Sequence, residues 1–305
     1  MSKFLTKIFL FIIPLVAIFV GLEYIARSTP NSYKYKEEYM VNYGDSINTI
    51  ILGSSHSFYG INPQYLENKS FNLANVSQDL KFDLYLLNRY IDKCSNLKTL
   101  IVPISYFTLF ETPLDKGDEQ FRVKFYEHYM GYSDTLLNKF KKLELYNPKI
   151  FQEKIGKYFK GVCCNEVDYG YDSNGWATNY NSSKIGNKIE SDAIKTITRH
   201  TPKNNTYFKE NLENLNQIAE LCHKRNIRLF FITTPTLPAY YNKIDSEKWS
   251  FTQSVINNVC IKYNASYLNY LEDERFEESD FFDVDHLCHK GAEKFSSILK
   301  DEIFE

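Results

Sequence analysis

Short apolar runs, each followed by a glycine, a proline or a polar residue, recur along the chain from residue 49 onward. Three of them lie in the first third, at 49–52, 71–74 and 99–104, and two lie near the C-terminus, at 227–234 and 265–271. Nearly continuous apolar runs of this length are typical of strands that are buried on both faces. We therefore predict five strands of one sheet.

Between these runs the apolar residues return at steps of three and four, which is the spacing of an amphipathic helix. This pattern covers residues 78–94, 209–226, 247–263 and 290–303. Strands that alternate with helices indicate a parallel sheet covered on both faces. The fold class we predict is α/β, with a flavodoxin-like, doubly wound, five-stranded sheet. In such folds, sites form at the carboxyl ends of the strands.

The alternation breaks between about residues 107 and 204. This stretch holds scattered aromatic residues, a predicted helix at about 135–145, and a turn-rich segment at 168–176. We interpret it as an insertion within an α/β domain that spans residues 47–305. Binding residues concentrate on loops, so we expect the insertion to lie over the carboxyl edge of the sheet and to line a substrate cleft.

The N-terminal region is an uncharged apolar run at residues 8–22, preceded by Lys3 and Lys7. It spans about 22 Å as a helix, and flanking residues extend it toward the ~30 Å of a bilayer core. We predict an uncleaved membrane anchor at 1–27 and a stalk at 28–46. A cleaved signal peptide and a buried helix are the alternatives. The two lysines predict a cytoplasmic N-terminus and a body outside the inner membrane.

Charge and composition narrow the classes of partner. Of the 305 residues, 36 are Lys or Arg and 38 are Asp or Glu, so the chain lacks the basic excess that binding to a phosphate backbone requires. We expect no nucleic-acid partner. The six cysteines show no paired spacing of a zinc site, and Cys94, Cys222 and Cys260 fall on apolar helical faces, which favours buried free thiols. We expect no metal and no cofactor.

Two short motifs carry the residue types of nucleophilic catalysis. Gly53, Ser54 and Ser55 directly follow the first strand, and Asp283 and His286 follow the fifth. A carboxylate three residues before a histidine on one loop can fix the imidazole tautomer and leave the other ring nitrogen for a serine. Because parallel strands end at one sheet edge, we expect Ser55 as nucleophile, His286 as base and Asp283 as its orienting acid.

At these motifs the sequence resembles the SGNH/GDSL hydrolase superfamily. The Gly53 motif stands where that family has its Gly-Asp-Ser block, and Asp283-x-x-His286 stands where it has its terminal block. The resemblance covers about 47–105 and 205–305. Within the family the chain is most similar to membrane-anchored proteins related to the D-alanyl transfer protein DltD and to the alginate acetylation proteins. Those proteins act on cell-envelope polymers outside the membrane.

The sequence also departs from the family. The second block normally contributes a glycine to the oxyanion hole, but residues 71–78 contain none, and the Gly-x-Asn-Asp block is absent after the third strand. Ser54, Asn75 and Gln78 are the candidates for oxyanion or substrate contacts, although a turn-forming role is the more common one for an asparagine such as Asn75. Trp176 is a candidate for stacking on a sugar ring, with packing in a hairpin turn as the alternative.

The resemblance implies a serine esterase or O-acyltransferase that acts on a cell-envelope glycan or polymer. Expected partners are the inner-membrane lipid bilayer, the acylated polymer and an integral-membrane acyltransferase. The triad is common to both reactions, so the sequence leaves hydrolysis and transfer open. The missing oxyanion donors favour an alternative, a catalytically inactive SGNH-like binding or scaffold subunit of an envelope-modifying complex.

Overall fold

The structure is a computed structural model, and it describes residues 2–67, 69–133, 143–164, 168–202 and 204–304. The chain forms two compact units. The first comprises Met1–Lys34 and Gln120–Tyr169, and the second comprises Tyr35–Glu119 and Gly170–Glu305. The predicted insertion is thus divided, because its middle part belongs to the first unit and its two ends belong to the second.

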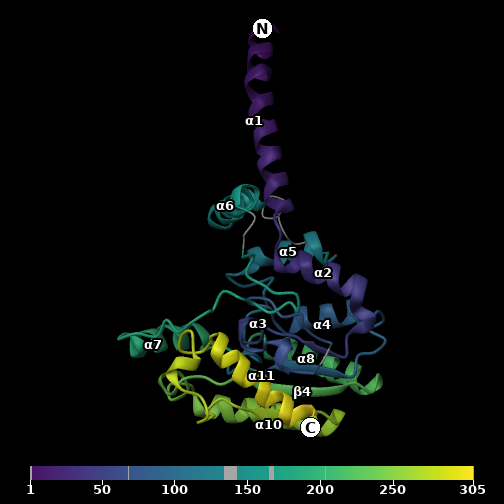
Figure 1. Cartoon of the computed structure of the whole chain (residues 1–305), viewed down its shortest axis with the longest axis vertical. Coiled ribbons are helices and arrows are strands. Elements are labelled where there is room, and N and C mark those ends of the chain that lie inside the picture. Colours follow the sequence, from purple (N-terminus) through teal and green to yellow (C-terminus); the bar gives the residue numbers. More distant parts are fainter. Residues whose placement is uncertain (1, 68, 134–142, 165–167, 203, 305) are drawn as a thin grey trace. The chain divides into compact units, whose positions relative to one another are not determined.

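The first unit is built on α1 (Ser2–Ser28), a single continuous helix (Figure 1). Its stretch Phe4–Ser28 is long and apolar enough to cross a membrane or to act as a signal sequence. Its apolar side chains are exposed, Phe11 by 70%, which argues against the buried-helix alternative. The unit also contains the helices α5 (Val123–Tyr129) and α6 (Pro148–Cys164) and the 3-10 turns η3 (Gln120–Arg122) and η5 (Glu144–Tyr146).

A buried ionic cluster ties α1 to the rest of the first unit. Glu23, near the end of α1, accepts a hydrogen bond of 3.0 Å from the backbone N–H of Glu144. The Glu144 carboxylate pairs in turn with Lys124 at 2.9 Å and with Lys154 at 2.7 Å. Buried charges require such partners, so these contacts fix the C-terminal end of α1 to α5, η5 and α6 within the first unit.

The second unit contains a five-stranded, fully parallel sheet in the order β2-β1-β3-β4-β5, and this confirms the predicted fold class. Ile50 of β1 lies between Phe71 of β2 and Leu100 of β3. The strands are somewhat shorter than their apolar runs, with these bounds: β1 Thr49–Ile51, β2 Ser70–Asn72, β3 Thr99–Pro103, β4 Arg228–Thr233 and β5 Ser266–Asn269.

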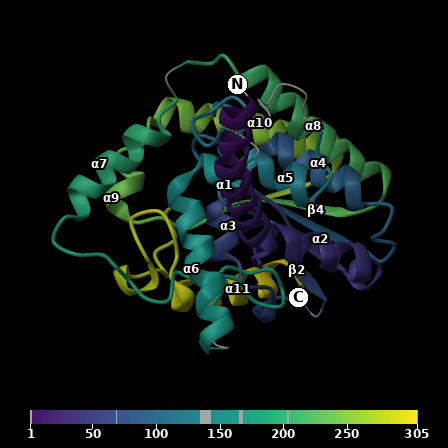
Figure 2. The ribbon, with the colours of Figure 1, turned by 90° about the horizontal axis from the view of Figure 1, so that it is seen from above.

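Helices cover both faces of this sheet (Figure 2). The helices α3 (Ser55–Gly60) and α11 (His289–Phe304) pack together on one face, where Phe295 and Leu299 meet strand residues such as Ile101. The opposite face carries α4, α8 and α10, of which α8 contacts both neighbours. Their bounds are Leu80–Tyr90, Phe208–Lys224 and Ser246–Tyr263. The shorter elements are α7 Ile189–His200, α9 Pro238–Tyr241, η1 Gly44–Ser46, η2 Pro63–Tyr65 and η6 Glu278–Asp280.

One sequence prediction has a different outcome, and another is not tested. The segment expected to be a stalk forms helix α2 (Ser32–Tyr43), and its Tyr39 stacks on Phe71 of β2 with ring centroids 4.2 Å apart. The polar residues of α2 make contacts with the rest of the fold, and such contacts cannot be seen in a hydropathy pattern. A helix was also predicted at about 135–145, but most of this segment falls within residues 134–142, which the structure does not describe.

Candidate active site

The turn after β1 depends on glycine at position 53. Gly53 has a φ of +108°, and a Cβ there would lie 2.0 Å from Cγ of Pro103. Only glycine fits such a backbone without strain. Its N–H donates a 2.8 Å hydrogen bond to the Asp83 carboxylate, which holds the turn from α4. Ser54 then serves as the N-cap residue of α3, and Ser55 is the first helical residue.

Ser55, His286 and Asp283 come together at the carboxyl edge of the sheet. Nε2 of His286 lies 2.9 Å from Oγ of Ser55, and Nδ1 of His286 lies 3.0 Å from Oδ1 of Asp283. Serine Oγ at one ring nitrogen and a carboxylate at the other is the arrangement of a Ser-His-Asp triad. Asp283 also accepts the backbone N–H of His286 at 2.9 Å, which fixes the loop that carries both residues.

A second carboxylate stands beside the same imidazole. Asp285 Oδ1 lies 3.4 Å from Nδ1 of His286, and Asp285 Oδ2 lies 3.1 Å from Nε2 of His56. On its other side, Nδ1 of His56 lies 3.0 Å from Oγ of Ser105, the second residue after β3. The rings of His56 and His286 stack with centroids 4.8 Å apart. A chain of polar contacts therefore runs from Ser55 to Ser105.

These contacts set the charges of the site. Burial opposes the charged form of His286, but the nearby Asp285 and Asp283 outweigh it and raise the pKa of His286 to about 10. The pKa of Asp285 is held well below its usual range, against its burial, by His286 and His56. Burial lowers the pKa of His200, whose Nδ1 lies 3.8 Å from Asp285, to about 3. The surroundings therefore shift the two imidazoles in opposite directions, His286 toward its charged form and His200 toward its neutral form.

An aromatic wall flanks His286. Tyr180 stacks between Tyr59 of α3 and Phe282, at centroid distances of 3.7 Å and 3.6 Å, and its ring meets the His286 ring edge-on at 5.6 Å. Tyr180 comes from the C-terminal end of the predicted insertion, as does His200. Phe107, at the start of the insertion, also reaches the site, where its ring lies 4.3 Å from the His200 ring and 6.0 Å from the His56 ring.

Trp176 does not match the sugar-stacking expectation. The residue is only 5% exposed, its Nε1 donates to the backbone carbonyl of Tyr59 at 2.8 Å, and its ring packs on His289 at 4.6 Å. With this burial no ring face remains open for a sugar, so the expectation is corrected. The indole instead fastens residues 172–177 to α3.

Asn75 and Gln78 are buried beside the Gly53 turn and bond to each other. The Asn75 amide donates to Oε1 of Gln78 at 3.3 Å, and Gln78 donates to Asp83 at 2.7 Å. These contacts do not test the predicted oxyanion role of the two residues. Both amides support the carboxylate that holds the N–H of Gly53, because a buried carboxylate needs donors.

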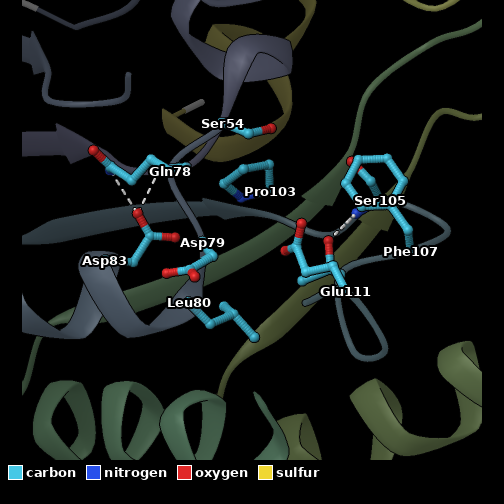
Figure 3. A pocket seen from close by; sticks show the side chains of 11 residues that line it. Ser54, Gln78, Asp79, Leu80, Asp83, Pro103, Ser105, Phe107 and Glu111 are labelled. Carbon is cyan, nitrogen blue, oxygen red and sulfur yellow. Dashed lines mark hydrogen bonds between the residues drawn. The ribbon is translucent and has the colours of Figure 1, made fainter. Parts of the chain in front are cut away.

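Three carboxyl groups surround a small cavity next to Gly53 and Ser54, with Ser105 and Phe107 on its other side (Figure 3). The cavity measures about 10 Å³, which is room for roughly one water molecule. Burial raises the pKa of Asp79 to about 6 and that of Asp83 to about 7, and it raises the pKa of Glu111 well above its usual range. The cavity is too small for a substrate.

His56, Asp285 and His286 are the described residues whose ligand atoms are close enough to hold a metal ion, all within 4.8 Å of one another. Here the same atoms are partnered with each other and with Ser55 and Ser105. A metal ion would have to replace this network, so the arrangement fits proton transfer better than metal binding.

Several residues of the site were not predicted from the sequence. Asp285, Ser105, His200 and Tyr240 were not among the predicted site residues. Tyr240 Oη lies 2.9 Å from Nδ1 of His200. The position of Ser105 directly after the third strand was a usable signal, because strand ends meet at this edge. His200 and Tyr240 had no such signal, since they lie on short helices outside the strand pattern.

The comparisons with known proteins add limited information. One protein-family model matches residues 190–305, less than half of the chain, and this stretch contains Asp283 and His286. No curated protein matches the sequence.

Three solved structures are similar in fold. A candidate platelet activating factor from Streptococcus pneumonia has 11% identity over 97% of this chain and 99% of its own, with a TM-score of 0.44. A GDSL-like lipase from Bacteroides thetaiotaomicron has 10% identity over 90% and 98%, with a TM-score of 0.41. A candidate acylhydrolase from Bacteroides fragilis has 7% identity over 84% and 86%, with a TM-score of 0.40. Similarity at this level does not assign an activity.

Proposed function

We propose that the protein is a serine acyl hydrolase or acyltransferase of SGNH type. The observation that supports this is the contact of Ser55 Oγ with His286 Nε2 at 2.9 Å, with Asp283 on the opposite nitrogen. In the reaction, neutral His286 accepts the proton of Ser55 as its Oγ attacks an acyl carbonyl. The resulting imidazolium returns that proton to the leaving alcohol. Asp283 keeps Nδ1–H oriented throughout.

Water then releases the acyl group from Ser55 in an esterase, whereas a sugar hydroxyl takes it in a transferase. The oxyanion donor we expect is the backbone N–H of Ser55, because the first N–H groups of a helix have no partner within the helix. The aromatic wall of Tyr59, Tyr180 and Phe282 beside His286 is the surface we expect an acyl chain or a sugar ring to contact.

The proposed substrate is an acylated glycan or other polymer of the cell envelope, and the proposed setting is the outer side of the inner membrane. Support comes from the uncharged apolar run at 8–22 within α1, which follows Lys3 and Lys7, and from the resemblance to envelope-modifying SGNH proteins. An integral-membrane acyltransferase is the proposed protein partner. A phosphatase reporter fused at the C-terminus should be active in intact cells, whereas activity only of a cytoplasmic reporter contradicts this location.

The decisive experiment is covalent labelling of the full chain with a serine-directed fluorophosphonate. We expect one adduct on Ser55, loss of the adduct in Ser55→Ala, and full labelling of the control Ser254→Ala, at an exposed position on α10. An unlabelled wild-type chain with a normal thermal transition would instead favour the scaffold function that the missing family oxyanion donors suggest. Assays with an acetylated glycan, with and without a sugar acceptor, then separate hydrolysis from transfer.

A further inference from the structure

The buried carboxylate of Asp285 is surrounded by imidazoles. Its side chain is 1% exposed, and His56 Nε2 comes closest to it at 3.1 Å, followed by His286 Nδ1 at 3.4 Å and His200 Nδ1 at 3.8 Å. His200 Nδ1 already lies 2.9 Å from the Tyr240 hydroxyl. An ionised carboxylate this deep in the fold depends strongly on each donor, and His56 is the donor with the best geometry.

The contacts with Asp285 and Ser105 together fix the tautomer of the His56 ring. An ionised Asp285 only accepts hydrogen bonds, so Nε2 of His56 carries the proton between them. In the neutral ring Nδ1 is then the acceptor, and the Ser105 hydroxyl, 3.0 Å away, donates to it. The His56 side chain is 4% exposed and stacks on His286, which leaves it little freedom to turn.

We propose that His56, oriented by Ser105, is a positioning residue that shares the Asp285 carboxylate with His286 and thereby keeps His286 able to take the proton of Ser55. This role rests on the proposed serine chemistry. Without the N–H of His56, the negative charge of Asp285 is balanced mainly by His286, and the imidazolium form of His286 becomes more stable. A base that holds its proton too firmly cannot accept another.

Other titratable and charged groups also face this cluster. They come from α3, from the C-terminal part of the insertion, from α7, from α9 and from the loop before α11. They are Tyr59, Tyr180, Arg199, His200, Tyr240 and Asp283. Besides burial, the charge of His56 lowers the pKa of His200, and the two rings meet edge-on at 6.2 Å, so a replacement of His56 affects His200 as well as Asp285. The ionisation of His286 is therefore followed individually in the test.

The test compares His56→Phe with His56→Gln in the full chain in detergent. The glutamine amide restores an N–H donor toward Asp285, whereas phenylalanine keeps only the ring. The expected result for His56→Phe is a shift of the pH midpoint of kcat/KM upward by about one unit, and thus about tenfold lower kcat/KM at neutral pH. His56→Gln should stay close to wild type, and Ser105→Ala should shift in the same direction by less. His223→Phe on α8 is the matched control and should change neither kcat/KM nor its pH midpoint.

A second readout is independent of activity. NMR titration of isotopically labelled histidines follows the ionisation of His286 directly, and the chain has only six histidines to assign. The same upward shift is expected for His56→Phe. An unchanged His286 titration in both His56→Phe and Ser105→Ala overturns the proposal, even if activity falls. If Ser55 fails to take the phosphonate, the proposed function fails instead, and the NMR result still decides the role of His56.

Discussion

Replacement of Asp285 by asparagine removes one of two negative charges beside His286 and should shift the activity toward lower pH. The Asp285 carboxylate lies 3.4 Å from Nδ1 of His286. At an effective dielectric constant of about 20, that contact is worth about 5 kcal/mol. This equals roughly 3.5 units of pKa. Asp283 and local relaxation retain part of the effect, so we expect Asp285→Asn to lower the pKa of His286 by about two units.

The assay is kcat/KM for p-nitrophenyl acetate from weakly acidic to alkaline pH, with the Ser55→Ala rate subtracted. In the wild type, kcat/KM should rise with pH until His286 loses its proton, near its pKa of about 10. In Asp285→Asn the rise should end about two units lower, so that activity at neutral pH increases. Asp283→Asn is the contrasting variant and should lose activity throughout. The reasoning is refuted if Asp285→Asn lowers kcat/KM at every pH with an unchanged midpoint.

Three further predictions concern the support of the site. Gly53→Ala forces a Cβ into Pro103 at positive φ, and we expect a loss of roughly 2–4 kcal/mol of stability in urea unfolding together with loss of phosphonate labelling. The folded-state pKa of Asp83, about 7, lies above its unfolded value, so its ionisation costs stability as pH rises from about 4 to 7. Asp83→Asn should therefore be more stable than wild type above neutral pH, by up to about 4 kcal/mol, and equal to it near pH 3. Trp176→Ala should cost roughly 3–5 kcal/mol, and a loss below 1 kcal/mol would contradict its packing role.

The sheet could be predicted from sequence because β1, β2 and β3 are buried throughout and β4 is mostly buried, which leaves apolar runs. The edge strand β5 is partly exposed and has the weakest run. Strand ends were less accurate, since an apolar residue just beyond a strand, such as Leu52, is buried like the residues within it. Hydropathy therefore reports burial rather than the exact end of a strand.

The site was predictable where chemistry coincided with strand ends, as for Ser55 and His286. For Trp176 the sequence left stacking and packing open, because an indole is equally suited to both, and only its environment distinguishes the two. The shared role of Asp285 was not visible for a related reason. It follows from the position of His56, which lies 229 residues away in the sequence.

The separation of Ser55 and His286 along the chain determines when, during synthesis, the proposed site can form. The ribosome makes Ser55 231 residues before its proposed partner His286, which lies just before α11. Until the loop with Asp283 and His286 has been made, Ser55 has no base beside it. Contacts between residues so far apart in the sequence form slowly, because a long loop must close. With Ser55 as the proposed nucleophile, acylation therefore waits until this loop has joined the edge of the sheet.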